Sequence, residues 1–273
     1  MTDFSKSLLY LWDNKGLFTG RLPDIDLHTH AVHALCIGID GEFEHSENGS
    51  KWIRCRSAMA PPGAPSAIRF SGTYSAILFY EPDSSEIQDF IYENSVPQKN
   101  KVSLHLKEEI KLLETIENLI SIEDENQITE RLEMIRVILN RKTETELRDQ
   151  RLLQVIRMIL SNPDENFSIE ELSEKIGLSP SRLAHLFKEE VGIPIRFFRT
   201  WFRLKAAILF IKNGSSVTEA AVNAGFYDSS HFSNTFRKMF GFSPTDMFDP
   251  NRKIRWYIKN EEEFQKMLAL RFV

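Results

Sequence analysis

The spacing of apolar residues changes near residue 96 and divides the chain into an extended part and a helical part. Before this point, short apolar runs such as Ala34–Ile39, Trp52–Arg56 and Tyr74–Tyr80 are separated by turn signals such as Asp40-Gly41. Such runs, bounded by Gly, Asn, Asp and Pro, are typical of β-strands and of the turns between them. The pattern therefore predicts a small all-β unit at the amino-terminal end.

Two amphipathic helices are predicted next, within residues 102–121 and 127–141. Apolar residues recur there at steps of three and four, the spacing of one helix face. They are Leu106, Ile110, Leu113, Ile116 and Ile120 in the first helix, and Ile128, Leu132, Ile135 and Leu139 in the second. Beyond the polar stretch 140–149, helical spacing continues to about residue 248.

The second half of the chain contains an internal duplication, which is its most informative pattern. Ser168-Ile-Glu-Glu171 and Ser216-Val-Thr-Glu219 both match the capping box that starts a helix, and they lie 48 residues apart. Gly177 and Gly225, also 48 apart, suit the left-handed position just after a short helix. A turn and a second helix follow each glycine, so the sequence predicts two helix-turn-helix units.

The second helices of the two units are offset by one further residue. Phe187 matches Phe236 and Gly192 matches Gly241, both at a spacing of 49. The second turn therefore contains one inserted residue.

Helical spacing also predicts which residues of these second helices point outward. They are Ser181, Arg182, His185 and Lys188 in the first unit, and Ser230, His231, Asn234 and Arg237 in the second. Arg can bind guanine and Asn can bind adenine through paired hydrogen bonds, whereas Ser and His offer single contacts to bases or phosphates. These positions could instead be solvated faces of a helical bundle, but two matching faces one repeat apart favour DNA binding.

A connecting helix is predicted between the two units, over Ile195–Asn213, with Pro194 before it and Gly214 after it. At 1.5 Å per residue it would span roughly 28 Å. Successive turns of the major groove on one face of DNA are ~34 Å apart, so this helix would let one polypeptide read two adjacent groove segments.

From about Leu147 to Phe248 the chain resembles the DNA-binding domain of the AraC/XylS family of bacterial transcription regulators. The most diagnostic segment is Ala220–Pro244, AAVNAGFYDSSHFSNTFRKMFGFSP, and the connecting helix adds Pro194, Arg203 and Ala206. By this resemblance, the residues that approach base edges are Ser181, Arg182, His185, Ser230, His231 and Asn234. The resemblance also implies an activator that contacts RNA polymerase.

In this family the segment after the sensor domain commonly dimerises, and the stripe from Leu106 to Ile120 would suit a helix-pairing seam. The same stripe could instead pack against the chain's own β unit or against the second helix. We expect a homodimer formed through this region.

Residues 20–82 resemble a cupin-type β-barrel, a sensor fold common in the same family. The segments that support this are Pro23–His30 and Ala60–Ser66. In metal-binding cupins the first segment supplies two histidine ligands, here His28 and His30, and the second supplies another ligand where this chain has Ser66. Because that ligand is missing, we expect these histidines to be hydrogen-bonded or to line a dry pocket, and we expect no metal cofactor.

A barrel interior could also hold a small-molecule effector. The candidate ligand-binding residues are His28, His30, Trp52, Arg54 and Tyr74. The identity of the effector is not specified by the sequence.

Composition narrows the class of protein further. The 273 residues are 42% hydrophobic and 27% charged, which is typical of a globular chain with two domains. No apolar run is long enough for a membrane span and no signal peptide is recognisable, so we expect a cytoplasmic protein that contacts no membrane. Cys36 and Cys55 are expected to be reduced, packed thiols. The net charge is −9 over residues 1–149 and +4 over residues 150–273, which permits an anionic partner for the second half.

These observations together predict an α+β two-domain chain with a cupin-like β-barrel, a helical linker and an all-α domain with two helix-turn-helix units. The expected boundaries are 1–95 for the sensor, 96–146 for linker and dimerisation helices, 147–249 for the DNA-binding domain, and 250–273 for an extension of unknown role. The expected function is sequence-specific binding of double-stranded DNA under the control of a small molecule, without enzymatic activity. The alternative is a metal-dependent cupin enzyme with an appended helical domain.

Overall fold

The computed structural model describes residues 6–12, 15–29, 32–80, 101–139, 149–161, 167–191, 194–249 and 252–258. The chain forms two compact units. Residues 1–145 belong to the first unit together with residues 238–259, and residues 146–237 belong to the second. A segment from the far end of the chain is therefore part of the amino-terminal unit.

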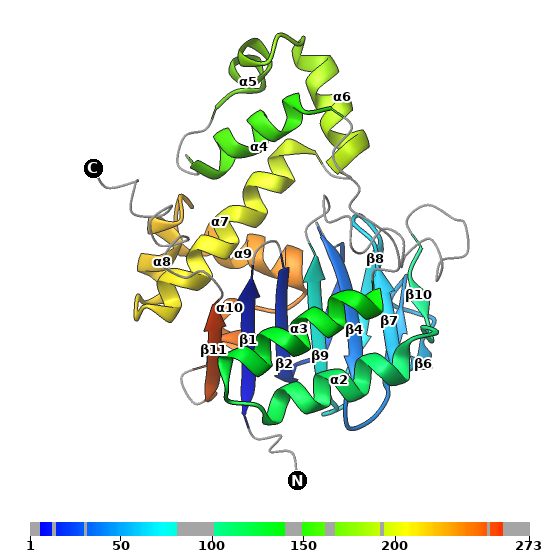
Figure 1. The fold of residues 1–273 in the computed structure, drawn as a ribbon. Coiled ribbons are helices and arrows are strands. Elements are labelled where there is room, and N and C mark those ends of the chain that lie inside the picture. Colours follow the sequence, from blue (N-terminus) through cyan, green and yellow to red (C-terminus); the bar gives the residue numbers. More distant parts are fainter. Residues whose placement is uncertain are drawn as a thin grey trace. The chain divides into compact units, whose positions relative to one another are not determined.

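The first unit contains two β-sheets (Figure 1). The larger sheet has the order β10-β7-β4-β9-β2-β1-β11, and the smaller has the order β3-β8-β5-β6. The strands are β1 Ser7–Trp12, β2 Lys15–Arg21, β3 Ile25–Thr29, β4 His33–Gly38, β5 Phe43–Ser46, β6 Ile53–Cys55, β7 Ser57–Ala60, β8 Pro65–Arg69, β9 Tyr74–Tyr80, β10 Ser103–Leu104 and β11 Ile254–Ile258. The all-β prediction is confirmed, but the described strands divide between two sheets and do not form one closed barrel.

Strands β4 and β9 are buried along their whole length because the larger sheet is covered on both faces. Leu35 and Leu78 point into the core beneath the helices, whereas their neighbours Cys36, Ile77 and Phe79 line a cavity on the other face, toward β3 and β8. This alternation is the period of two that a strand imposes on its side chains.

Helices α2 (Glu109–Ser121) and α3 (Glu125–Leu139) lie across one face of the larger sheet (Figure 1). Both predicted helices are confirmed, although the first begins at Glu109 because residues 103–104 form strand β10. The side chains of Leu106, Ile116 and Ile120 are buried against this sheet, and only Ile110 of the predicted seam is largely exposed, at 72%. The stripe is thus core of its own unit, and it is not available as a helix-pairing seam.

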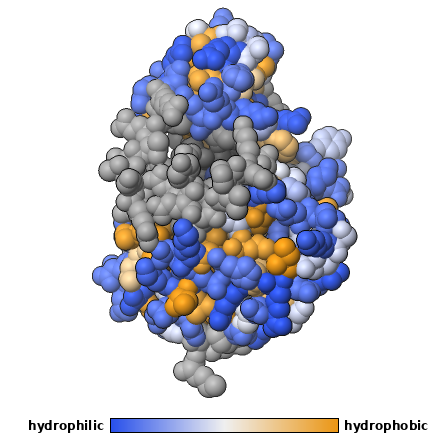
Figure 2. All heavy atoms as spheres, turned by 90° about the vertical axis from the view of Figure 1, so that its right-hand side faces the viewer, coloured by the Kyte–Doolittle hydropathy of each residue, from blue (hydrophilic) through white to orange (hydrophobic). Residues whose placement is uncertain are grey.

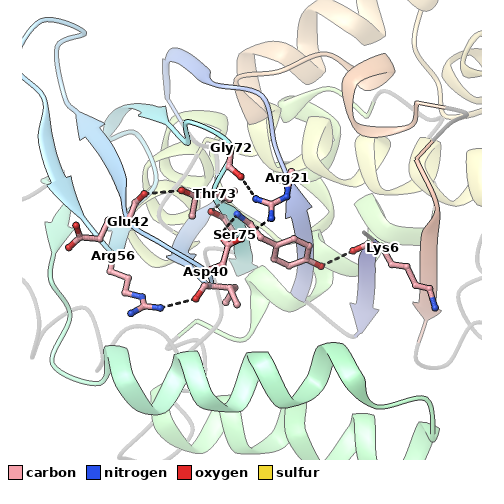
Figure 3. Close-up of polar contacts among 10 residues, drawn as sticks. Lys6, Arg21, Asp40, Glu42, Arg56, Gly72, Thr73 and Ser75 are labelled. Atoms are coloured by element: carbon pink, nitrogen blue, oxygen red, sulfur yellow. Dashed lines mark hydrogen bonds and ion pairs between the residues drawn. The ribbon is translucent and has the colours of Figure 1, made fainter. Parts of the chain in front are cut away.

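A polar network holds the loop that follows β4 against the turn before β9 (Figure 3). The Arg21 guanidinium donates to the Asp40 carboxylate at 2.8 Å and also to the Gly72 carbonyl. The other carboxylate oxygen of Asp40 accepts the Tyr74 backbone N–H at 2.7 Å. Arg56 donates to the carbonyls of Gly38 and Ile39. These bonds give the buried loop backbone the partners that it needs.

The segment after the second helix-turn-helix unit forms β11, which pairs in parallel with β1 at the edge of the larger sheet. Arg255 donates to the Tyr10 hydroxyl at 3.0 Å, and the hydroxyls of Tyr257 and Thr129 are 2.8 Å apart. Part of the carboxy-terminal extension is therefore docked on the first unit as a strand. The strand covers an edge that would otherwise expose unpaired backbone groups of β1.

The second unit is helical. Its elements are α4 Arg151–Ser161, α5 Ile169–Lys175, α6 Pro180–Val191, α7 Ile195–Lys212, α8 Val217–Asn223 and α9 Ser229–Phe240. The last three residues of α9 belong to the first unit, as does the short helix α10 Pro244–Met247. No helix among the described residues is long and apolar enough to span a membrane. Cys36 and Cys55 are buried free thiols, as expected.

The first unit contains two buried histidines whose pKa values lie below the ordinary range. His33 and His45 are 8% and 2% exposed, and burial lowers the pKa of His33 to about 3 and that of His45 to about 4. His45 Nε2 lies 3.1 Å from the Ser66 hydroxyl, whereas His33 Nδ1 has no hydrogen-bond partner among the described residues. Both rings are therefore neutral in the folded chain near neutral pH.

We predict that the first unit loses stability as the pH falls from 6.5 toward 4. The unfolded chain binds a proton at each histidine below pH 6.5, while the folded chain does not, so each residue costs about 2 kcal/mol between pH 7 and pH 5. Urea unfolding of the full chain, followed by near-ultraviolet circular dichroism across this range, measures the loss. His33→Phe should flatten the pH dependence by about half, and an unchanged slope in this variant would contradict the assignment.

Candidate nucleic-acid interface

The first helix-turn-helix unit consists of α5 and α6. The Ser168 hydroxyl accepts the Glu171 N–H at 3.1 Å, and the Glu171 carboxylate accepts the Ser168 N–H at 2.6 Å, which is the predicted capping box. These bonds lower the pKa of Glu171. Gly177 ends the first helix at φ +66°, a left-handed conformation that favours glycine. The turn therefore forms from local chemistry.

The second unit, α8 and α9, repeats this construction. Ser216 and Glu219 form the same capping box, with distances of 3.2 Å and 2.9 Å, and the pKa of Glu219 is lowered in the same way. Gly225 takes φ +80°. Both predicted boxes and both glycine positions are thus confirmed, whereas Gly192, which was matched to Gly241, lies outside the described residues.

Buried aromatic rings fix the rotation of the second helix in each unit. Phe187 in α6 is fully buried and packs edge-to-face on Phe198, with ring centroids 5.4 Å apart. Phe232 and Phe236 in α9 are also fully buried, at 5.7 Å from each other. With these residues inside, the opposite face of each helix must point to solvent.

All eight residues predicted to contact DNA lie on those exposed faces. They are Ser181, Arg182, His185, Lys188, Ser230, His231, Asn234 and Arg237. His185 Nε2 is 3.8 Å from the Glu189 carboxylate, one helical turn further on. The His231 N–H donates to the Asp228 carboxylate at 2.6 Å, so Asp228 caps the start of α9.

Helix α7 joins the two units. Its 18 residues correspond to about 27 Å, close to the length expected from the sequence. Phe198, which packs on Phe187 of α6, also contacts Phe202, with centroids 4.9 Å apart. Ten of the α7 residues are buried, including Lys205, whose ammonium lies 5.5 Å from the Phe202 ring. Helix α7 is therefore packed along most of its length.

The candidate effector residues do not gather at one place. Tyr74 is buried beneath the helices, with its hydroxyl 2.8 Å from Thr19 and donating to the Lys6 carbonyl. Arg54 is exposed and pairs with Glu42 at 2.6 Å. The Arg69 guanidinium lies over the Trp52 ring, 3.9 Å from the ring centroid. His28 is paired across β3 and β8 with Ser66, and His30 lies outside the described residues.

The donors near Ser66 do not fit a cupin metal centre. The Ser66 hydroxyl is engaged by His45, and the His28 Nδ1–H donates to the Asp26 carbonyl at 2.9 Å. Burial lowers the pKa of His28. Among the described residues, no group of three or more His, Cys, Asp and Glu side chains is placed to hold a metal ion.

An apolar cavity of about 10 Å³ lies between the two sheets of the first unit. Small residues such as Ala34, Ala58 and Ala60 line it on the larger sheet, and Phe240, the last residue of α9, lines it as well. None of the five candidate effector residues is part of this lining. Phe240 was not among the residues predicted from the sequence, although its step of four from Phe236 marks it as a continuation of the buried face of α9.

The surface carries further exposed apolar side chains. Figure 2 shows one face of the molecule, where orange apolar patches interrupt a largely hydrophilic surface. In the first unit the exposed large apolar residues include Leu27, Ile53, Ile110, Met134 and Val137. In the second they include Phe197, Val222 and Tyr227, the last of which is 89% exposed.

Comparison with known proteins agrees with this geometry. Residues 172–249 match a family model described as a helix-turn-helix domain. The chain is 36% identical over 84 residues to the arabinose operon regulatory protein of Escherichia coli. This alignment covers 30% of this chain and 29% of that protein. It is 28% identical over 192 residues to the transcriptional activator RhaS of Klebsiella pneumoniae, covering 67% of this chain and 66% of that protein.

The alignment to the regulator MtrA of Neisseria gonorrhoeae, 31% identical over 97 residues, covers 35% of this chain and 32% of that relative. The chain thus spans only about a third of the length of several curated relatives. Among solved structures, ToxT from Vibrio cholerae has a TM-score of 0.57 at 12% identity and covers 87% of this chain and 98% of its own. This similarity supports the fold, a β-rich amino-terminal unit followed by a helical helix-turn-helix unit.

Proposed function

We propose that this chain, whose residues 172–249 form a helix-turn-helix domain of the AraC type, is a sequence-specific DNA-binding transcription regulator. The observation that supports this best is the repeated outward face of α6 and α9, held by buried aromatic rings at both ends of α7. Each subunit would read two adjacent major-groove segments. Arg182 and Asn234 would make base contacts, and Lys188 and Arg237 would contact phosphates.

The charge of the reading domain suits a moderate affinity. Residues 150–249 have a net charge of only +1, so few counterions are released on binding and non-specific affinity is low. Specificity would then depend on direct contacts at both units and on pairing of subunits. An activating role through RNA polymerase, and work in the cytoplasm where the chromosome lies, are part of the same proposal.

The alternative, a metal-dependent cupin enzyme, is less well supported. Three or more ligands are typical of such centres, and here the position of the third is Ser66, bonded to His45. The curated relatives with printed activities are transcription regulators.

The first unit would act as the sensor, through the cavity between its sheets. Its lining is almost wholly apolar, and at about 10 Å³ it has room for no more than about one water molecule, so an effector would have to displace the Phe240 ring to enter. Phe240 closes part of this cavity, 5.3 Å from Phe79, and a Cβ at the next residue, Gly241, would overlap the Ile25 side chain. The end of α9 is therefore fitted closely to the sensor, and an effector that displaces the Phe240 ring would shift the population of α9 arrangements.

Dimerisation is proposed through the outer face of α3 rather than through the buried stripe of α2. Met134 and Val137, 44% and 58% exposed, are three residues apart and share one helix face. Exposed apolar pairs of this kind suit a two-fold interface.

Variants that remove a base contact should differ in their effect on DNA binding from a variant that removes a phosphate contact. Arg182→Ala and Asn234→Ala should each weaken binding to genomic fragments selected by the wild-type chain by about 1–3 kcal/mol, because a paired hydrogen bond to a base is lost. Lys188→Ala should weaken binding to all sequences and reduce the salt slope by about 1. Gel retardation at several salt concentrations measures both effects. The control is Lys175→Ala, which removes the same charge from an exposed position of α5 that is not on the outward face of α6. Equal effects of Lys175→Ala and Lys188→Ala would contradict the proposed phosphate contact of Lys188.

Removal of the Phe240 ring should release α9 from the sensor. We predict that Phe240→Ala raises DNA affinity in the absence of any added small molecule by at least about fivefold, the lower end of typical allosteric coupling. Phe242→Ala is the matched control, since Phe242 is equally buried but does not line the cavity. Thermal unfolding is measured in parallel, because removing a core ring costs about 3–5 kcal/mol. Unchanged affinity in a folded Phe240 variant would oppose the coupling.

The dimer proposal predicts a change of mass. Light scattering of the full chain should give a dimer, and the double variant Met134→Glu, Val137→Glu should give a monomer, because two charges would be buried in the interface. Glu114→Ala, which changes an exposed residue on α2 and not on the outer face of α3, should leave the dimer intact. A monomeric wild-type chain would refute the interface.

A further inference from the structure

The structure identifies the residue by which the two helix-turn-helix units differ. In the first unit the Leu178 N–H donates to the Ser173 carbonyl, and in the second the Phe226 N–H donates to the Ala221 carbonyl, at 2.9 Å and 3.0 Å. Leu178 and Phe226 are therefore equivalent, 48 residues apart. Both close the turn after the glycine in the same way.

The equivalence shifts by one residue at the start of the next helix. Ser179 caps α6, with the Arg182 N–H donating to its hydroxyl at 3.2 Å, and Asp228 caps α9 through the His231 N–H. Ser179 and Asp228 are 49 residues apart. One residue lies between Phe226 and Asp228, namely Tyr227, and it has no counterpart in the first unit.

Tyr227 is held outward by its neighbours. Phe226 is buried and packs edge-to-face on Phe232 and His231, with centroids 5.2 Å and 5.5 Å away. The Tyr227 N–H points at His231 Nδ1, 3.4 Å away, and Asp228 fixes the first turn of α9. The backbone on both sides is thus anchored, while the Tyr227 side chain is 89% exposed, the largest value for a large apolar residue in the part of the chain that the structure describes.

The position of this ring relates it to the proposed DNA face. Tyr227 directly precedes Asp228, the cap of α9, and its backbone N–H lies beside His231 on the exposed face of that helix. An aromatic side chain with a polar tip, kept in water by a rigid turn, is typical of a binding contact, because a tyrosine offers large contact area at a low entropy cost. In protein–DNA complexes, tyrosine hydroxyls are among the donors to phosphate oxygens.

We propose that Tyr227 is a DNA-backbone contact peculiar to the second unit. Its hydroxyl donates to a phosphate oxygen beside the bases read by Ser230, His231 and Asn234, and its ring packs on the adjacent sugar. The contact rests on the proposed function. It makes the two halves of the site unequal, since the second unit grips one more phosphate than the first.

The test compares Tyr227→Phe and Tyr227→Ala in the full chain, on genomic fragments selected by the wild-type chain. Tyr227→Phe should weaken binding by about 10-fold because one hydrogen bond to a charged group is lost, and Tyr227→Ala should weaken it further. The salt slope should stay the same in both variants, since no cation is removed. Phosphate ethylation interference should lose one position in Tyr227→Phe and keep the others.

The control is Val222→Ala, which trims another exposed apolar residue of the same unit, on α8, and should bind as the wild type does. Wild-type affinity and an unchanged interference pattern in Tyr227→Phe and Tyr227→Ala would overturn the contact. The proposed function would survive that result as long as Arg182→Ala still weakens binding. If the wild-type chain selects no DNA, both proposals fail.

Discussion

The burial of aromatic rings in the second helix of each helix-turn-helix unit is the constraint on which the rest of the structure depends. Phe187 and Phe236 have no exposed surface, and each would lose several kcal/mol if its helix turned its other face inward. The rotation of α6 and α9 is therefore fixed by packing rather than by the polar residues that would read DNA. This separation leaves the outward positions free to vary, so that recognition can change while the fold does not.

Much of the second compact unit, which holds the helix-turn-helix units, could be predicted because the determinants of its structure are local in sequence. A capping box, a glycine at positive φ and a helical apolar stripe each act within one or two turns of chain, and Ser168, Gly177 and Phe187 each took the predicted place. The internal repeat strengthened these signals, because each appears again 48 or 49 residues later. The outward residues followed by elimination once the buried ones were known.

The first unit was predicted less completely because its determinants are distant in sequence. Strands β4 and β9 were found from their apolar runs, but whether strands close into one barrel depends on pairings such as β1 with β11, some 245 residues apart. The stripe from Leu106 to Ile120 has the same periodicity whether it meets a second copy or its own sheet. The structure shows that the stripe packs on its own sheet, because Leu78 and Tyr10 of that sheet lie in one core with it. Likewise, nothing local to Phe240 shows that it reaches a cavity lined by Ala34 and Ile68.

The two helix-turn-helix units differ on both sides of their second helices. In the first, Leu178 is followed directly by Ser179. In the second, the exposed ring of Tyr227 precedes α9, and this helix ends in the buried ring of Phe240, which belongs to the first compact unit. A helix of 12 residues that is stiff between these points passes a displacement from one end to the other, since its hydrogen bonds resist bending. Under the proposed sensing mechanism, a change that moves Phe240 would act on α9, because Phe240 is the last residue of that helix. The proposed effector would therefore act through the second helix-turn-helix unit, which contains α9.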